Sequence, residues 1–395
     1  MTRRVRGAIH VARSARSPRS TWGIGDGRWA TDDGLWIMIE LTINGVVVRV
    51  DIGSTVLDAA RAADVDVPTL CEYAGHEAFT SCMVCLVEDR RSGHLLPACS
   101  APAEAGMRIV CDSDSVKLAR RTALEMLLSE HVGDCEAPCR RACPRGVDIP
   151  MLLRKIQAGE SLGDAEIPCA GCDAPCEKAC RRAQVDAAVA IHATLGNPSS
   201  PEATAGGERN MQHSTADTQQ PRGAMARVRT DSVSVTGKML EGEAEEYLKE
   251  ASVEGRVSDG DIERGLSAEM AKREAARCLH CDCRAPVSCK LRRYAEAYGA
   301  KQGSWRPTPR VRVSRDLTQG AVVYESGKCI RCGLCVRVCR AAGEPVGLSF
   351  VGRGYDMRIG PPQGYGMTEA LGSSAQACVK ACPTGALAYC RQDER

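Results

Sequence analysis

The most specific chemical signal in the sequence is the spacing of cysteines near the end of the chain. Residues 328–339 carry the pattern C-x2-C-x2-C-x3-C, and the pair Cys382-Pro383 follows later. In this pattern three closely spaced thiolates bind three irons of a [4Fe-4S] cluster, and a distant Cys-Pro completes it. A second complete set is missing, because Gly372 and Ala375 stand where its first two cysteines would be. The pattern therefore predicts one [4Fe-4S] cluster on Cys329, Cys332, Cys335 and Cys382, with Cys339 and Cys378 left over as a degenerate second site.

The composition of this chain of 395 residues favours several small domains built around metal sites. Phe, Trp and Tyr make up only 4% of the residues, whereas there are 23 cysteines. Metal ligation supplies folding free energy directly to small folds of this kind. Repeated C-x2-C and C-x3-C spacings are unlike a secreted disulfide scaffold, and no secretory signal is evident, so we expect reduced thiols in the cytoplasm. The net charge of +2 and the lack of an apolar run approaching about 20 residues favour neither nucleic-acid nor membrane partners.

Another set of cysteines follows a segment with strong β-sheet signals. The β-branched runs 39–43 and 46–50 flank Asn44-Gly45, which is typical of a type I′ hairpin turn because both turn positions need positive φ. Thr55 can then cap a short helix that covers the sheet. The cysteines that follow have the spacing C-x10-C-x2-C-x13-C, which suits a [2Fe-2S] cluster in which each iron takes two thiolates. The expected ligands are Cys71, Cys82, Cys85 and Cys99.

The residues around these cysteines resemble a known family. The matching stretches are Pro68–Cys71, Ser81–Glu88, Leu96–Cys99 and Gly106-Met107. They resemble the N-terminal ferredoxin domain of the large iron–sulfur subunit of complex I, which NAD-linked hydrogenases and formate dehydrogenases also carry. The resemblance implies a β-grasp [2Fe-2S] domain over 38–112. Residues 1–37 are rich in Arg, Ser and Gly, and we expect them to be a disordered or wrongly assigned N-terminal extension.

The next region, 113–195, begins with a helical pattern and then repeats a cysteine motif. An amphipathic helix is expected over 114–130, and it ends shortly before His131. In the complex I family a His at this place is a cluster ligand; the other interpretation is a solvated His near a helix C-terminus. Complex I continues with C-x2-C-x5-C. This chain instead carries C-[ED]-A-P-C-x2-A-C twice, beginning at Cys135 and at Cys172.

The twin motifs resemble the N-terminal domain of the glutamate synthase small subunit and of dihydropyrimidine dehydrogenase. That helical domain holds two [4Fe-4S] clusters, whose ligands are exchanged between its two motifs. The resemblance implies one cluster on His131, Cys135, Cys139 and Cys180, and another on Cys143, Cys169, Cys172 and Cys176, where His131 and Cys169 are the spare candidates for the fourth ligands. In that family an FAD- and NAD-binding domain comes next. No G-x-G-x-x-G follows a strand in this chain, so we expect no FAD or NAD site here.

A polar linker leads to a further cysteine pattern. Residues 196–240 are rich in Ser, Thr, Gly and Pro and hold too few apolar residues to offset the entropy of ordering. Charged helices are expected in the segment 241–300, and the second of them runs into C-x2-C-x-C-x5-C. Four thiolates in such a span suit a [4Fe-4S] cluster or a closed structural zinc site. The residues concerned are Cys278, Cys281, Cys283 and Cys289.

The sequence thus predicts an α+β, multidomain protein. We expect a β-grasp [2Fe-2S] ferredoxin domain, an α-helical double [4Fe-4S] domain and, over 318–395, a bacterial ferredoxin-like [4Fe-4S] domain. Within the last of these, the run 347–356 resembles the segment between the two cluster motifs in complex I and hydrogenase subunits.

One [2Fe-2S] cluster and three to four [4Fe-4S] clusters, without a substrate-site motif, predict an iron–sulfur electron-transfer subunit. The resemblances imply two partners: an NADH-oxidising flavoprotein like the diaphorase subunit of complex I or hydrogenase, and a catalytic hydrogenase, formate dehydrogenase or glutamate-synthase-like subunit. We expect the [2Fe-2S] domain and the closing domain to be the two ends of this electron path. The alternatives are an oxidoreductase that converts a substrate with its own unrecognised cofactor, and a zinc-stabilised interaction scaffold.

Overall fold

The computed structural model describes residues 21–23, 28–31, 38–160, 162, 169, 172–196, 238–305, 311–318 and 322–389. The chain forms two compact units, of which the first comprises residues 1–69 and 85–119 and the second residues 70–84 and 120–395. Most of the predicted extension 1–37 and of the predicted linker 196–240 lies outside the described residues, as does Cys390. No helix in the described part of the chain has the length and apolar character needed to span a membrane.

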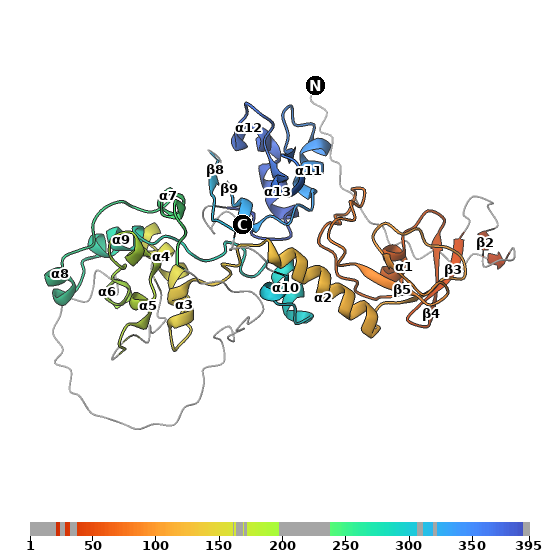
Figure 1. Cartoon of the computed structure of the whole chain (residues 1–395), viewed down its shortest axis with the longest axis horizontal. Helices are drawn as coiled ribbons and strands as arrows, with labels where there is room; N and C mark the ends of the chain where they lie inside the picture. Colours follow the sequence, from red (N-terminus) through yellow and green to blue (C-terminus); the bar gives the residue numbers. More distant parts are fainter. Residues whose placement is uncertain are drawn as a thin grey trace, which may run out of the picture. The chain divides into compact units, whose positions relative to one another are not determined.

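The first unit is a mixed β-sheet covered by one helix (Figure 1). Its elements are β1 (Thr21–Gly23), β2 (Arg28–Thr31), β3 (Met38–Ile43), β4 (Val46–Asp51), α1 (Val56–Ala62), β5 (Leu86–Asp89), β6 (His94–Pro97) and β7 (Arg108–Val110). The strands pair in the order β1-β2-β3-β7-β5-β6, and β4 also pairs with β3. β7 runs parallel to β3, whereas the other pairs are antiparallel. β1 and β2 belong to the segment before Met38, which we had expected to be a disordered or wrongly assigned extension.

Local sequence signals explain the hairpin and the helix of this unit. Asn44 and Gly45 connect β3 to β4 with φ of 48° and 83°, which confirms the expected turn. Thr55 begins α1 with a capping box, in which its hydroxyl accepts the N–H of Asp58 and the Asp58 carboxylate accepts the N–H of Thr55. Alternate side chains of β3 are buried together with one face of α1, so the helix and the sheet share one apolar core.

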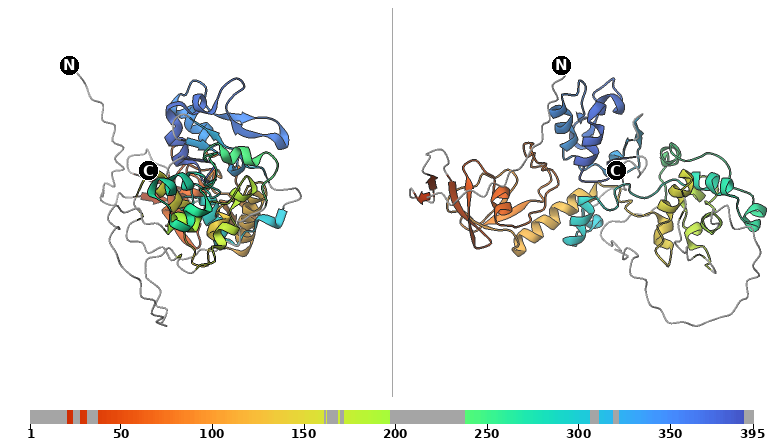
Figure 2. Two further views of the ribbon diagram at one scale, coloured as in Figure 1. Left: turned by 90° about the vertical axis from the view of Figure 1, so that its left-hand side faces the viewer. Right: turned by 180° about the vertical axis from the view of Figure 1, so that it is seen from behind.

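The second unit contains the end of a long helix, α2 (Asp114–Ser129), followed by many short helices. These are α3 (Pro138–Ala142), α4 (Ile149–Ala158), α5 (Pro175–Lys178), η1 (Arg181–Gln184), α6 (Ile191–Leu195), α7 (Glu243–Leu248), α8 (Asp259–Arg264), α9 (Ala268–Ala276), α10 (Lys290–Ala297) and η2 (Gln302–Trp305), where η marks a 3-10 helix. α4 and α6 pack against α9, and α3 packs against α5 (Figure 2). Helices from both sides of residues 197–237 therefore share one core, although the sequence had placed them in separate segments, 113–195 and 241–300.

The C-terminal part of the second unit combines a small sheet with two packed helices. Its elements are β8 (Asp316–Leu317), β9 (Val322–Tyr324), η3 (Ser326–Lys328), α11 (Leu334–Ala342), β10 (Ser349–Val351), η4 (Gly354–Asp356), β11 (Arg358–Gly360), α12 (Met367–Leu371), η5 (Gly372–Ser374), α13 (Ala375–Ala381) and β12 (Leu387–Tyr389). β9 lies between β8 and β12 in an antiparallel sheet, and β10 and β11 form a hairpin. α11 packs against α13, which brings the early and late cysteines of this region close together.

Candidate metal centres

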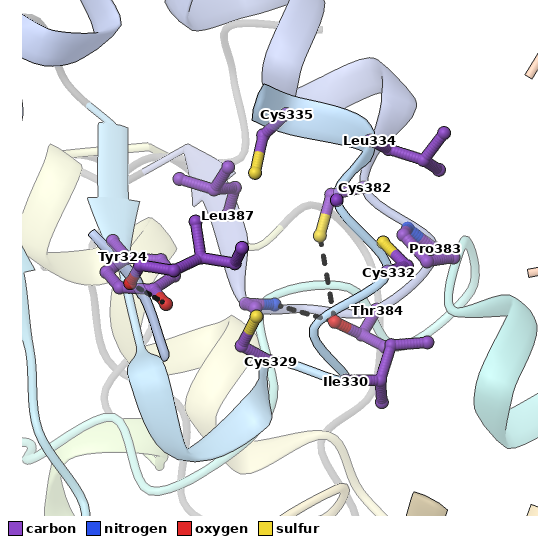
Figure 3. A pocket seen from close by; sticks show the side chains of 13 residues that line it. Tyr324, Cys329, Ile330, Cys332, Leu334, Cys335, Cys382, Pro383, Thr384 and Leu387 are labelled. Atoms are coloured by element: carbon purple, nitrogen blue, oxygen red, sulfur yellow. Dashed lines mark hydrogen bonds between the residues drawn. The ribbon is translucent and has the colours of Figure 1, made fainter. Parts of the chain in front are cut away.

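A small cavity in the C-terminal part is lined by all four ligands predicted there. The sulfur atoms that point into it belong to Cys329, Cys332, Cys335 and Cys382 (Figure 3). Most of the other walls of the cavity are apolar side chains such as Leu334, Ile359 and Leu387. Its four thiols fit a [4Fe-4S] cluster, in which each iron takes one protein ligand.

Tight backbone turns bring these thiols to the cavity. Arg331 and Gly333 have φ of 54° and 70°, so the chain coils back on itself before α11 begins. Cys382 is the C-cap residue of α13. The N–H of Arg331 donates to Cys329 Sγ at 3.4 Å, and the hydroxyl of Thr384 lies 3.6 Å from Cys382 Sγ. Such contacts stabilise thiolates and help to set the reduction potential of a bound cluster.

Burial dominates the acid–base properties of this site. It raises the pKa of Cys335 well above its usual range, and the neighbouring thiols of Cys329 and Cys332 raise it further. An apolar cavity disfavours the charged thiolate, whereas a bound metal ion favours it. Iron binding would therefore compensate for the electrostatic cost of gathering these thiols.

The predicted [2Fe-2S] ligands are divided between the two units, because the boundary falls between Val84 and Cys85. In the second unit a side-chain hydrogen bond with Cys71 raises the pKa of Cys82, so these two thiols are neighbours. In the first unit Cys85 and Cys99 adjoin the paired ends of β5 and β6, and the carbonyl of Cys85 accepts the N–H of Ala98 at 3.1 Å. All four thiols are buried.

In the middle region the structure groups the cysteines differently from the prediction. The wall of a second cavity includes four cysteines, Cys139, Cys180, Cys278 and Cys281. Burial raises the pKa of Cys139, and the thiols of the other three raise it further. The prediction had assigned Cys139 and Cys180 to one cluster and Cys278 and Cys281 to another. The structure thus places members of two predicted groups around one cavity.

The remaining members of those two predicted groups lie near one another. They are His131, Cys135, Cys283 and Cys289. Burial raises the pKa of Cys135, and the thiols of Cys283 and Cys289 raise it further. The ammonium of Lys328 lowers the pKa of Cys135, of Cys283 and of the buried His131. Nδ1 of His131 accepts the N–H of Gly133 at 2.9 Å, and Nε2 has no hydrogen-bond partner among the described residues. His131 is only 4% exposed and is therefore not the solvated side chain that was the alternative interpretation.

The other predicted group of the middle region stays together. Burial raises the pKa of Cys169, and the thiols of Cys143 and Cys172 raise it further. Burial and the carboxylate of Glu177 raise the pKa of Cys176 to about 11, and Cys143 and Cys169 also contribute. These four cysteines therefore lie near one another in the structure.

Sequence patterns did not reveal the contact between the [2Fe-2S] ligand segment and the C-terminal part. Nη2 of Arg337 donates to the carbonyl oxygens of Cys71 at 2.7 Å and of Cys332 at 3.4 Å. Close by, the rings of Phe79 and Phe350 stack with centroids 5.5 Å apart. These residues are the only two Phe in the chain, but they are far apart in sequence and carry no spacing signal. The segment of Cys71 therefore adjoins the C-terminal cavity, whereas the two had been expected at opposite ends of the electron path.

A second contact joins the C-terminal cavity to the neighbourhood of Cys135. The N–H groups of Lys290 and Leu291 both donate to the carbonyl of Pro383, at 2.9 and 3.3 Å. A Cβ added to Gly385 would lie only 2.4 Å from Cys283 Sγ, so glycine is needed at this close approach. The turn that carries Cys382 thus packs directly on the segment that carries Cys283.

Buried charges hold these segments in place. Arg315 is 1% exposed and pairs with Glu325 at 3.2 Å, and Lys328 pairs with the same carboxylate at 2.6 Å. Burial alone would raise the pKa of Glu325, but Lys328 and Arg315 lower it to about 2.

Among the described residues, no three His, Cys, Asp or Glu side chains converge closely enough to hold a single metal ion.

Comparisons with known proteins find a family match in the N-terminal part and relatives that resemble part of the chain. Residues 37–114 match the family described as "2Fe-2S iron-sulfur cluster binding domain". A subunit of the NADP-reducing hydrogenase of Solidesulfovibrio fructosivorans is 44% identical over 104 residues, which are 25% of this chain and 18% of that protein. The 78 kDa subunit of the mitochondrial NADH-ubiquinone oxidoreductase of Candida albicans is 35% identical over 125 residues, 32% of this chain and 17% of that one. The chain thus spans less than a fifth of the length of these relatives.

Among solved structures, the NAD+-reducing [NiFe]-hydrogenase in the H2-reduced state matches with a TM-score of 0.44 and 18% identity, covering 89% of this chain and 86% of that one. The family match includes all four predicted [2Fe-2S] ligands. Residues 37–114 of the chain are therefore a 2Fe-2S iron–sulfur cluster binding domain, and the chain is similar over part of its length to a hydrogenase subunit and to a subunit of NADH-ubiquinone oxidoreductase.

Proposed function

We propose that this chain is an iron–sulfur electron-transfer subunit, which carries electrons between a flavoprotein that oxidises NADH and a separate catalytic subunit. Its similarity to a hydrogenase subunit and to a subunit of NADH-ubiquinone oxidoreductase supports both partners. The observation that carries the proposal is the arrangement of thiols in the second unit, where each group of cysteines adjoins the next.

The successive groups of cysteines can be followed from the [2Fe-2S] segment toward the middle region. Arg337 joins the carbonyl of Cys71 to that of Cys332, and therefore joins the first site to the C-terminal cavity. At the far side of that cavity, the turn of Cys382 packs on the segment of Cys283 and Cys289. In this order the C-terminal cavity lies between two other sites, so we propose that it is not an end of the electron path.

The succession continues through two short segments that each carry ligands of successive sites. Cys281 and Cys283 are separated by one residue, yet Cys281 lines the middle cavity and Cys283 adjoins Cys135. Cys139 and Cys143 both belong to α3 or its C-cap, with the N–H of Cys143 bonded to the carbonyl of Cys139. We propose that the neighbourhood of Cys143 is the inner end of the path, in a helical double [4Fe-4S] domain.

Iron–sulfur clusters, when bound, supply one-electron redox centres, and the protein sets their spacing and electrostatics. Apolar side chains such as Leu334 and Leu387 line the C-terminal cavity and would limit the access of water to a bound cluster. The guanidinium of Arg337 and the buried ammonium of Lys328 lie beside successive sites and would stabilise the extra negative charge of a reduced centre. N–H groups such as that of Arg331 would hold the thiolates in place.

The test is anaerobic reconstitution of the full chain, followed by iron and sulfide analysis, EPR spectroscopy and reduction by NADH. About 18 irons per chain would match one [2Fe-2S] and four [4Fe-4S] centres. Reduction of these centres by NADH should require an added flavoprotein of the hydrogenase diaphorase type, because no dinucleotide-binding motif is present in the sequence. A colourless protein with stoichiometric zinc would overturn the proposal, as would tightly bound FAD or molybdopterin with turnover of a substrate.

A further inference from the structure

We infer that Cys139, Cys180, Cys278 and Cys281 together hold one [4Fe-4S] cluster, so that the four cysteines of the C-x2-C-x-C-x5-C segment serve two different clusters. The inference rests on the proposed function, because it assigns ligands within the same electron path. It divides that segment after Cys281, and leaves Cys283 and Cys289 for the site of Cys135.

The first argument is the likeness of the two thiol-lined cavities. The C-terminal cavity and the middle cavity are of similar size, and each is lined by four cysteines. Apolar side chains, among them Leu153, Val189 and Ile191, form much of the wall of the middle cavity. Two cavities of equal size and equal donor set can accept the same group. The ferredoxin-type spacing at the C-terminal cavity identifies that group as a [4Fe-4S] cluster.

A network of buried charges joins the segment of Cys180 to that of Cys278. Nη1 of Arg182 donates to the carbonyl of Arg277 at 3.0 Å, and Nη2 of Arg277 pairs with Asp186 at 3.1 Å. Both guanidinium groups are fully buried. Because these arginines lie next to or near Cys180 and Cys278 in the sequence, their bonds hold the two thiols on the same cavity.

The loop between Cys278 and Cys283 is held just as firmly. Arg315 donates to the carbonyls of Leu279 at 3.1 Å and His280 at 2.7 Å, and His280 has a positive φ of 47°. On the other side Arg154, from α4, pairs with Asp282 at 2.5 Å. A loop fixed at Leu279, His280 and Asp282 cannot readily turn Cys281 and Cys283 to a common point, and a buried ion pair is costly to break.

Cys283 and Cys289 have other neighbours. Cys283 Sγ is the atom that a Cβ on Gly385 would meet at 2.4 Å, and the residue after Cys289, Lys290, bonds to the carbonyl of Pro383. The segment of these two cysteines therefore packs on the C-terminal turn, and both of their thiols raise the pKa of Cys135. The buried His131, whose Nε2 has no partner among the described residues, is the fourth candidate donor of that site.

Paired substitutions in the full chain distinguish this assignment from a single site on the segment. We propose C139S, C278S and C283S alone, and the doubles C139S/C278S and C278S/C283S, each reconstituted anaerobically with 57Fe. If Cys139 and Cys278 share a cluster, C139S/C278S should lose about four of roughly 18 irons. C139S alone and C278S alone should each lose the same number. C278S/C283S should lose about eight, because it damages two clusters.

The opposite pattern, with eight irons lost from C139S/C278S and four from C278S/C283S, would overturn the inference. Serine can keep an iron through its oxygen, so EPR spectra provide a second readout when iron content does not fall. The same [4Fe-4S] signal should then change in C139S, C180S, C278S and C281S; a change of different signals in C139S and C278S would contradict us. The [2Fe-2S] signal should persist in each variant and shows that the protein is folded. Zinc without iron in the parent chain would overturn the proposed function and this inference together.

Discussion

The C-terminal cavity and the middle cavity have the same donors and nearly the same volume, but the chain builds them in different ways. Three of the four thiols of the C-terminal cavity come from residues 329–335, and the fourth is the C-cap of α13. The middle cavity takes its thiols from α3, from the end of α5 and from the loop after α9. The first site is mostly local in sequence, whereas the second exists only when three segments pack together.

The two cavities also differ in the secondary structure that surrounds them. The C-terminal part has an antiparallel sheet, β12-β9-β8, and two helices that pack against each other. Around the middle cavity α3 and α5 have only 5 and 4 residues. Isolated helices shorter than about 12–15 residues are marginal in water. The comparison teaches that the middle site should depend on its metal for folding far more than the C-terminal site does.

Removal of iron should separate the two regions most strongly. After chelation under anaerobic conditions, we expect the amides of α3, α5 and α6 to exchange ~1000-fold faster, a loss of about 4 kcal/mol of local stability. The amides of β9 and β12 should change much less, because a sheet and an apolar core remain. Hydrogen-exchange mass spectrometry measures both. Equal loss of protection in the two regions would refute the proposed difference.

Substitution of the buried Arg315 should damage the middle region. Arg315→Gln removes the bonds to the carbonyls of Leu279 and His280 and leaves Glu325 with one cation fewer. We expect a loss of about 3 kcal/mol in the free energy of unfolding, because a buried ion pair is broken on one side. Chemical denaturation followed by cluster absorbance measures it. The matched control is Arg312→Gln, at an exposed position three residues earlier, which should change stability by no more than about 0.5 kcal/mol.

Enlarging Gly385 should test the contact between the two regions. Gly385→Ala places a methyl group 2.4 Å from Cys283 Sγ, so one of the two segments must move. We expect a cost of about 2 kcal/mol and an altered EPR signal for the cluster of Cys283, with the C139S-sensitive signal unchanged. Gly303→Ala is the control, since a Cβ there meets nothing within 4 Å. A normal signal in Gly385→Ala would mean that Cys283 holds no metal at this position.

Loss of the charge of Arg337 should shift a potential with little loss of structure. Arg337→Gln removes a cation that lies between Cys71 and Cys332. A reduced centre carries an additional negative charge, so we expect the midpoint potential of the C-terminal cluster to fall by roughly 60 mV, about 1.4 kcal/mol for one electron. An EPR-monitored redox titration measures it. Arg340→Gln, at an exposed position on the same helix, should leave the potential within about 20 mV of the parent value.

The smallest effect is expected at the degenerate second site of the C-terminal part. Cys339 Sγ lies 3.6 Å from Cys378 Sγ and 3.3 Å from the hydroxyl of Ser374, in a fully buried position. Cys339→Ala should cost about 1 kcal/mol through lost packing and should leave the iron content unchanged. Iron analysis and thermal unfolding measure the two quantities. A loss of four irons would show that this pair takes part in a cluster after all.

The sequence by itself determined the features that depend on neighbours along the chain. Asn44-Gly45 determined the hairpin turn, because few residues accept positive φ at both positions. The run from Cys329 to Cys335 determined where the C-terminal cavity forms, because residues so close in sequence must lie within reach of one another. The family match to residues 37–114 agrees with the spacing of the cysteines from Cys71 to Cys99.

The tertiary structure alone decided which thiols of the middle region face one another. Spacing shows that Cys278, Cys281, Cys283 and Cys289 are close in sequence, but it does not show toward which side each of them points. That choice follows from the packing of α4 on α9 across residues 197–237 and from buried arginines that fix the loop. The nearness of Cys71 to Cys332 has the same origin, because it depends on the side chain of Arg337 and on two Phe rings far apart in sequence.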